Sequence, residues 1–309
     1  MEERTAALLE AIKAGKITTE QAVQQFENSA THLRDIPIDN LKVDVLDCGF
    51  PTLNEYMFFK RGRGELLILG ARPSVGKSAF MFQVAAHVAV TDNVLIFSLE
   101  MDKESIKARM LAAKTGLSLQ RILKGEVPDA KLKDSARQID GLNYYIDDRS
   151  GLEVKALVSS AIDFHRKTPV SLVVIDYLQL VKSGNRASRN EEVGDVSLEL
   201  KQLAKRLKCP VLAAAQLNRK CIERGNMMLA NGKRPNYIPE MGDLRESGNI
   251  EQDADGILFL SRHEVFAPGN RVGEADISIA KQRNGPTGSE IFRWLGASTR
   301  FLDPKVEEI

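Results

Sequence analysis

The segment Gly64–Ser78, GELLILGARPSVGKS, constrains the fold of this chain more than any other stretch. Leu66 to Gly70 form a short apolar run that predicts a buried strand. A turn marked by glycine and proline follows and ends in Gly76-Lys77-Ser78, and residues 79–90 have helical length without a breaker. Strand, loop and helix in this order are the context in which such a turn binds phosphate, because backbone N–H groups face it at the positive end of the helix.

This interpretation predicts that ATP and Mg²⁺ bind at the loop. The nucleotide-binding residues would be Arg72, Pro73, Ser74, Val75, Gly76, Lys77, Ser78 and Ala79. Lys77 would reach the β- and γ-phosphates, and the Ser78 hydroxyl would ligate Mg²⁺. Ala71 stands where the strict motif has glycine. The alternative is an ordinary glycine-containing turn, since Gly-Lys-Ser also occurs by chance, though rarely in this setting.

The composition fits a cytoplasmic globular protein. The 309 residues are 43% hydrophobic and 28% charged, and no apolar run approaches the ~20 residues that span a membrane. The first residues, MEERTAALLE, lack the basic-then-apolar order of a signal peptide. Cys48, Cys209 and Cys221 share no metal-type spacing and leave an odd thiol, which favours a reducing compartment. We therefore expect no membrane partner.

The length allows one large domain and a small appendage. Residues 2–30 read as two short helices, too small to bury their apolar faces alone, and residues 29–44 read as a polar linker. The predicted division is a helical N-terminal extension and linker over residues 1–40 and a second domain over residues 41–309.

The second domain shows alternating strand and helix patterns. Strands are predicted at 94–98, 144–147, 170–175 and 211–215, and helices near 103–115, 129–139, 153–167 and 190–207. This alternation predicts an α/β fold with a mostly parallel central sheet flanked by helices. After Gly256, three strand patterns follow without intervening helices, which predicts an antiparallel C-terminal extension of the sheet.

Three polar residues follow buried strands, at the edge where ligands of parallel sheets bind. Glu100 could orient and deprotonate the water that attacks the γ-phosphate. Asp176 could hold Mg²⁺ beside Ser78, and the Gln216 amide could hydrogen-bond the γ-phosphate. Each residue taken singly could instead cap a loop at a strand end.

Charge is unevenly distributed, although the net charge is only +1. Residues 182–234 hold 12 Lys/Arg against 5 Asp/Glu, which suits either a phosphate backbone or solvated helix faces. Asn284-Gly285 predicts a hairpin turn directly after Lys281 and Arg283, whose cations could be merely solvated or could reach ATP on another subunit. Residues 243–255, DLRESGNIEQDAD, read as a polar loop that could be an ordinary surface loop or contact single-stranded phosphates.

Six phrases in order resemble the motifs of the DnaB-type replicative DNA helicases, which are hexameric rings with RecA-like motor domains. They are GARPSVGKS, FSLEM, IDYLQL, AAAQLNR, DLRESGNIEQDAD and KQRNGPTG, and the resemblance covers roughly residues 45–303. The first loop position is commonly alanine in that family too. The resemblance implies a RecA-like P-loop NTPase core.

The resemblance also implies roles for the residues singled out above. Lys77 and Ser78 would bind the triphosphate and Mg²⁺, Glu100 would be the catalytic base, and Asp176 the acid on the metal side. Gln216 would couple ATP to DNA. The trans-acting cations would be Lys281 and Arg283, and the residues holding the DNA backbone would be Arg245, Glu246 and Gly248.

By the same resemblance the chain is an ATP-dependent replicative helicase. It would act as a homohexamer, move 5′ to 3′ on single-stranded DNA and unwind forked duplex, with primase and a helicase loader as further partners. Full-length members of that family carry a large helical N-terminal domain, and this sequence has some forty residues before the part that resembles the family. The alternatives are another RecA-like DNA-dependent ATPase and a non-catalytic module that binds a helicase.

Overall fold

The computed structural model describes residues 18, 42–184, 189–244 and 247–306. The predicted helices of residues 2–30 and the boundary near residue 40 lie outside these ranges. Asp44–Ile309 form one compact unit, which holds every element described below. Within the described ranges, no helix is long and apolar enough to cross a membrane.

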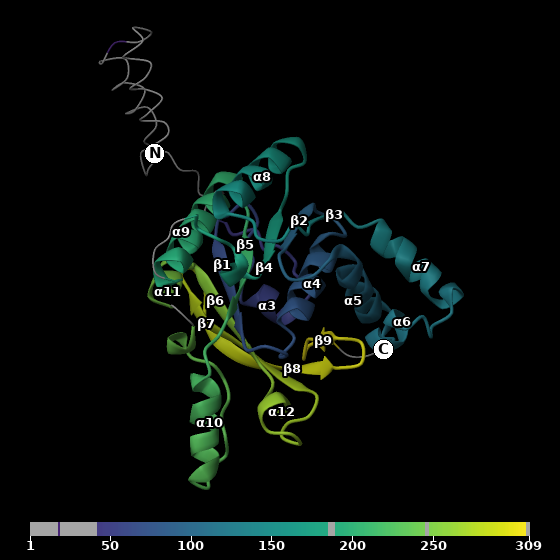
Figure 1. The fold of residues 1–309 in the computed structure, drawn as a ribbon, viewed down its shortest axis with the longest axis vertical. Helices are drawn as coiled ribbons and strands as arrows, with labels where there is room; N and C mark the ends of the chain where they lie inside the picture. The colour runs from purple at the N-terminus through teal and green to yellow at the C-terminus, as the bar shows by residue number, and fades with distance from the viewer. Residues whose placement is uncertain (1–17, 19–41, 185–188, 245–246, 307–309) are drawn as a thin grey trace. The chain divides into compact units, whose positions relative to one another are not determined.

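One nine-stranded sheet forms the centre of this unit, in the order β3-β2-β4-β5-β1-β6-β7-β8-β9 (Figure 1). The strands are β1 (Leu66–Ala71), β2 (Val94–Ser98), β3 (Tyr144–Asp147), β4 (Leu172–Asp176), β5 (Val211–Gln216), β6 (Gly256–Ser261), β7 (Glu274–Gln282), β8 (Gly288–Leu295) and β9 (Arg300–Leu302). The first six strands pair in parallel, and β7 to β9 continue the sheet antiparallel. The expected mostly parallel sheet with antiparallel C-terminal strands is confirmed.

Helices cover both faces of the sheet because the parallel strands are apolar on both sides. The longer helices are α4 (Lys77–Val88), α5 (Lys103–Thr115), α7 (Asp129–Asp140), α8 (Val154–Lys167), α9 (Arg189–Leu207) and α10 (Lys220–Ala230). The shorter helical segments are α3 (Pro51–Glu55), α6 (Leu119–Leu123), η3 (Leu178–Leu180), η4 (Met241–Asp243), α11 (Ser247–Asp253) and α12 (His263–Phe266). Leu67 and Leu69 of β1 belong to the core that includes α4 and α5, whereas Leu66 and Ile68 belong to the core that includes α8 and α9.

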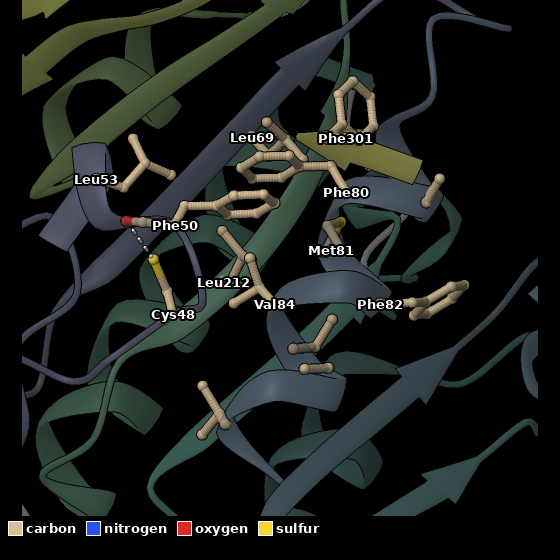
Figure 2. Packing of buried hydrophobic residues seen from close by; sticks show 14 of the residues in the cluster. Cys48, Phe50, Leu53, Leu69, Phe80, Met81, Phe82, Val84, Leu212 and Phe301 are labelled. Atoms are coloured by element: carbon tan, nitrogen blue, oxygen red, sulfur yellow. Dashed lines mark hydrogen bonds between the residues drawn. The ribbon is translucent and has the colours of Figure 1, made fainter. Parts of the chain in front are cut away.

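An aromatic cluster fixes α4 (Figure 2). This helix follows the predicted phosphate-binding loop of residues 72–78, called the phosphate loop below. Phe80 stacks on Phe50 at 5.0 Å between ring centroids, and Phe301 meets its other side edge-on at 5.6 Å. The Gln83 side chain exchanges hydrogen bonds with the backbone of Phe301. Helix α4 is therefore clamped between the segment before α3 and strand β9, which positions the loop at its N-terminus.

Two local expectations fail, and the sequence patterns miss one of the longer helices. Residues 243–255 do not form a continuous polar loop, because α11 occupies Ser247–Asp253. Ile250 of this helix and Ala254 just after it are buried in the core beside α9. The sequence patterns also miss α10, whose buried positions Cys221 and Gly225 are four residues apart. Finally, α12 separates β6 from β7, so these strands are not joined without a helix.

Candidate active site

The polar residues that follow the buried strands meet at one edge of the sheet. Strands β2, β4, β5 and β1 are neighbours, and their parallel register aligns Ser98 with Asp176 and Ala71 with Gln216. Glu100 lies two residues beyond the end of β2. The carboxyl edge therefore brings Glu100, Asp176, Gln216 and the phosphate loop together, as the parallel-sheet argument expects.

The phosphate loop turns sharply into α4 at Gly76. This residue has φ of 110°, and a Cβ there would lie 2.9 Å from Phe301 Cζ, so both the backbone and the packing require glycine. Phe80 N–H donates to the Gly76 carbonyl at 3.0 Å, which closes the first turn of the helix. The positive end of α4 consequently begins at the loop, where it favours an anion.

Lys77 lies over a buried carboxylate. Its Nζ is 3.1 Å from Asp176 Oδ1 and 4.0 Å from the ring centroid of Tyr177. The Asp176 side chain is 0% exposed, and within the described residues neither of its oxygens accepts a hydrogen bond with acceptable geometry. The charge of Lys77 is thus the nearest compensation for a carboxylate removed from water.

A tight turn presents Glu100 beside this pair. The buried Ser98 hydroxyl donates to the Met101 carbonyl at 2.6 Å and accepts from the Met101 N–H at 3.2 Å. Leu99 N–H donates to the Asp176 carbonyl at 2.9 Å. These bonds hold the turn against β4 and leave the Glu100 side chain exposed at the rim of the site.

Gln216 is held through its backbone. Its N–H donates to Gln179 Oε1 at 3.1 Å, and its carbonyl accepts from Gln179 Nε2 at 3.4 Å. Gln216 also lines the cavity beside the loop.

Lys77, Glu100 and Gln216 line a cavity of about 500 Å³, a volume in the range of small-molecule sites, whereas Asp176 lies buried behind Lys77. Every predicted nucleotide-binding residue lines this cavity except Val75, whose side chain is buried. The lining residues that sequence reasoning missed are Met101, Arg109, Tyr177, Trp294 and Thr299. Met101 and Tyr177 directly follow the predicted residues Glu100 and Asp176. No local signal marks Arg109, Trp294 and Thr299, because they reach the cavity from distant elements.

A second cavity of about 310 Å³ shares Ala79, Arg109 and Thr299 with the first. Its lining is mostly apolar side chains from α4, α5 and α7. Glu100, Lys77 and Gln216 all line the larger cavity and not this one, so the larger cavity is the candidate active site.

The residues at the loop fit Mg²⁺. Among the described residues, both buried carboxylate oxygens of Asp176 lack a hydrogen-bond donor, and Ser78 lines the adjoining cavity. Protein Mg²⁺ sites commonly use one or two such ligands and complete the octahedron with phosphate oxygens and water. Within the described ranges, no group of three or more His, Cys, Asp and Glu side chains forms a separate metal site.

Lys281 and Arg283 lie at the opposite, amino edge of the sheet. Gln282 pairs with Gly256, and Gly256 is level with Leu67 near the start of β1. The phosphate loop begins five residues further along β1, about 17 Å away at the usual rise per residue. These two cations therefore lie far from the loop of their own chain.

Neither cation is merely solvated. Lys281 Nζ donates to the Glu251 carbonyl, and Arg283 Nη2 donates to the Gln252 carbonyl at 2.8 Å. Both carbonyls belong to the last turn of α11, where cations are favoured. Burial lowers the pKa of Lys281, and the neighbouring Arg283 lowers it further.

The predicted DNA-contacting residues are only partly described. Arg245 and Glu246 lie outside the described residues, whereas Gly248 is exposed in the first turn of α11. Helix α11 thus extends from the predicted DNA-binding segment to the carbonyls that hold Lys281 and Arg283.

Comparisons with known proteins agree on one family. Residues 46–303 match the model of the DnaB-like helicase C-terminal domain. The chain is 33% identical over 300 residues to the replicative DNA helicase DnaC of Bacillus subtilis, covering 94% of this chain and 62% of that protein. It is 40% identical over 247 residues to the replicative DNA helicase DnaB of Pasteurella multocida, covering 77% and 51% respectively. The chain thus spans between half and two thirds of the length of these relatives.

Solved structures give the same result. One solved ATPase domain superimposes with a TM-score of 0.77 at 28% identity, covering 93% of this chain and 98% of that domain. A DnaB-like replicative helicase, studied with its interactions with primase, also gives a TM-score of 0.77, at 26% identity and covering 98% of this chain and 75% of its own. The chain belongs to the family of DnaB-like helicase C-terminal domains.

Proposed function

We propose that this chain is the ATP-hydrolysing motor of a replicative DNA helicase. It would work as a homohexameric ring that moves along single-stranded DNA, 5′ to 3′, and separates the strands of a fork. The observation that carries the proposal is the convergence of Lys77, Glu100 and Gln216 around one cavity at the carboxyl edge of the sheet, with Asp176 buried against Lys77.

ATP would bind with its phosphates in the loop, where Lys77 can turn from Asp176 toward them. When bound, Mg²⁺ would be held by Ser78 and Asp176 and would neutralise charge on the phosphates. Glu100, exposed at the rim, would orient the attacking water and accept its proton. Gln216 would hydrogen-bond the terminal phosphate and respond to its loss.

The remaining cations would come from a neighbouring copy. Lys281 and Arg283 lie at the amino edge, about 17 Å along β1 from their own phosphate loop. An arginine supplied from another subunit stabilises transition-state charge and is worth about 10³-fold or more in rate. We therefore place each site between two subunits, with Arg283 as the finger.

Arg283→Ala tests this arrangement. We expect turnover to fall by about 10³-fold while nucleotide binding remains nearly unchanged. Arg293→Ala, which changes an exposed arginine of β8 in the same sheet, serves as the control. In mixed rings the Arg283→Ala subunit should disable the adjoining site, and retained activity of that site would contradict the trans assignment.

Arg245→Ala tests the DNA contact. We expect weaker binding of single-stranded DNA and a shallower dependence of that binding on salt, while basal hydrolysis survives. Loss of basal hydrolysis would instead place Arg245 at the nucleotide. A wild-type chain with no ATP turnover, with or without DNA, would favour the alternative of a non-catalytic module.

Contacts with primase and with a helicase loader also belong to this proposal. The DnaB-like helicase of similar structure was solved with its interactions with primase. Co-sedimentation of the purified chain with primase would test that contact. We further propose that residues 1–40 form a separate helical extension that docks on a neighbouring subunit.

A further inference from the structure

The residues that directly follow β5 pair with the segment that precedes Arg245. Leu217 and Leu244 form an antiparallel bridge. Asn218 N–H donates to the Asp243 carbonyl at 2.9 Å, and its side chain donates to the Gly242 carbonyl at 3.2 Å. Residues 242–244 are therefore attached to the two residues that follow Gln216.

The same residue, Leu217, is attached to the phosphate loop. Its N–H donates to the Ala71 carbonyl at 3.1 Å, and its carbonyl accepts from Arg72 Nη1 at 2.7 Å. Arg72 lines the nucleotide cavity, and its Nε is buried without a hydrogen bond to any described residue. A shift of Arg72 on nucleotide binding would thus be transmitted directly to Leu217.

An ion pair secures the other side of this connection. Arg224, in the second turn of α10, donates to both carboxylate oxygens of Asp243 at 2.8 and 2.7 Å. The Asp243 side chain is 1% exposed and also accepts from the Glu240 N–H at 2.8 Å. Arg224 Nη2 additionally donates to the Ile238 carbonyl at 3.3 Å. A bidentate pair of this kind fixes orientation as well as distance.

We infer that Arg224 is a positioning residue that couples the nucleotide site to the DNA-binding segment. By holding Asp243, Arg224 keeps Leu244 paired with Leu217. A movement of Arg72 or Gln216 is then transmitted through this bridge to residues 245–248. This inference rests on the proposed function, because it assumes that residues 245–248 contact DNA.

The structure offers a matched pair at the opposite edge of the sheet. Arg61 donates to both oxygens of Asp92, and its side chain is 39% exposed, close to the 35% of Arg224. Asp92 lies in the turn before β2, at the amino edge and away from the cavity. Loss of this pair should lower stability without touching the route from Leu217 to Leu244.

The experiment compares Arg224→Met, Arg224→Lys and Asp243→Asn with Arg61→Met in the full chain. ATP turnover is measured with and without a single-stranded oligonucleotide, at a temperature where circular dichroism shows each variant folded. We expect Arg224→Met to lose about tenfold in DNA stimulation, the scale of a typical coupling between sites, while basal turnover changes less than twofold. Asp243→Asn should act in the same direction, and Arg224→Lys should restore part of the stimulation. Arg61→Met should keep it.

Two results would overturn the inference. One is full DNA stimulation in Arg224→Met. The other is a parallel fall of basal and stimulated turnover, tracking thermal stability as in Arg61→Met. If wild-type turnover does not respond to DNA at all, the proposed function fails and the inference with it, and the wild-type measurement alone identifies that case.

Discussion

Lys77 should stabilise the protein even without nucleotide, because Asp176 is buried against it. The Asp176 side chain is 0% exposed, neither oxygen accepts a hydrogen bond from the part of the chain that the structure describes, and Lys77 Nζ lies 3.1 Å away. Lys77→Met keeps the length of the side chain and removes the charge. The carboxylate would then be left in the core with its charge uncompensated.

The expected loss follows from that geometry. Removing one partner of a buried ion pair costs about 3–5 kcal/mol, and we expect the lower end because Lys77 is 14% exposed toward the cavity. For a domain of this size, about 3 kcal/mol corresponds to a fall of roughly 6–12 °C in Tm. Asp176→Asn should cost less, about 1 kcal/mol, since the ammonium left behind borders the cavity and can be hydrated.

Urea unfolding of the nucleotide-free protein measures these differences. Trp294 is the single tryptophan of the chain and lines the site, so its fluorescence reports locally, and far-UV circular dichroism reports the whole fold. Coincident transitions establish a common unfolding event.

The double variant Lys77→Met/Asp176→Asn provides the control. It should recover about 2 kcal/mol relative to Lys77→Met, because the uncompensated charge is gone. A Lys77→Met protein within about 0.5 kcal/mol of wild type, or no recovery in the double variant, would refute the reasoning.

Three further predictions follow from other parts of the chain. Gly76→Ala should weaken ATP binding at least about tenfold in calorimetric titration, since φ of 110° and the contact with Phe301 disfavour a side chain. The control is Gly62→Ala, where φ is 68° and no described atom lies within 4 Å, and it should leave ATP binding unchanged. The hydrogen bond from Arg61 lowers the pKa of Asp92 from 3.8 to about 2. The ionised carboxylate therefore stabilises the fold at pH values above its ordinary pKa, and this stabilisation is lost as the pH falls toward 2. The difference between the urea midpoints at about pH 6 and pH 3 should be smaller in Asp92→Asn than in wild type. Deletion of residues 1–30 should shift a hexamer to smaller species in sedimentation velocity, and an unchanged hexamer would contradict a role of this segment in subunit contacts.

The carboxyl-edge site could be anticipated from the sequence because its residues are tied to strand ends. A parallel strand that ends at Asp176 or Gln216, or two residues before Glu100, delivers that side chain to the same edge as the phosphate loop, whatever the strand order. The order itself, which puts β4 and β5 between β2 and β1, is not written in any local pattern. Arg109 and Trp294 could not be predicted as cavity-lining residues for the same reason, since they belong to elements whose placement depends on the whole sheet.

Helix α11 shows a different limit. Its residues are almost all polar, so the periodic signal is reduced to Ile250 and Ala254, and the segment reads as a loop. The side-chain hydrogen bonds of Lys281 and Arg283 could not be predicted either, because they go to backbone carbonyls, which every sequence carries. Arg224 and Asp243 are 19 residues apart, and only the turn between α10 and η4 brings them together.

The register of β1, β6 and β7 has a consequence for assembly. If the phosphate loop and Arg283 stand at opposite edges of one sheet, no protomer can complete its own site. Head-to-tail contact joins unlike edges, and such contact either closes into a ring or grows without end. A copy defective in both the phosphate loop and Arg283 would then disable two catalytic centres, its own and that of a neighbour, which makes the assembly sensitive to small amounts of such a mutant chain.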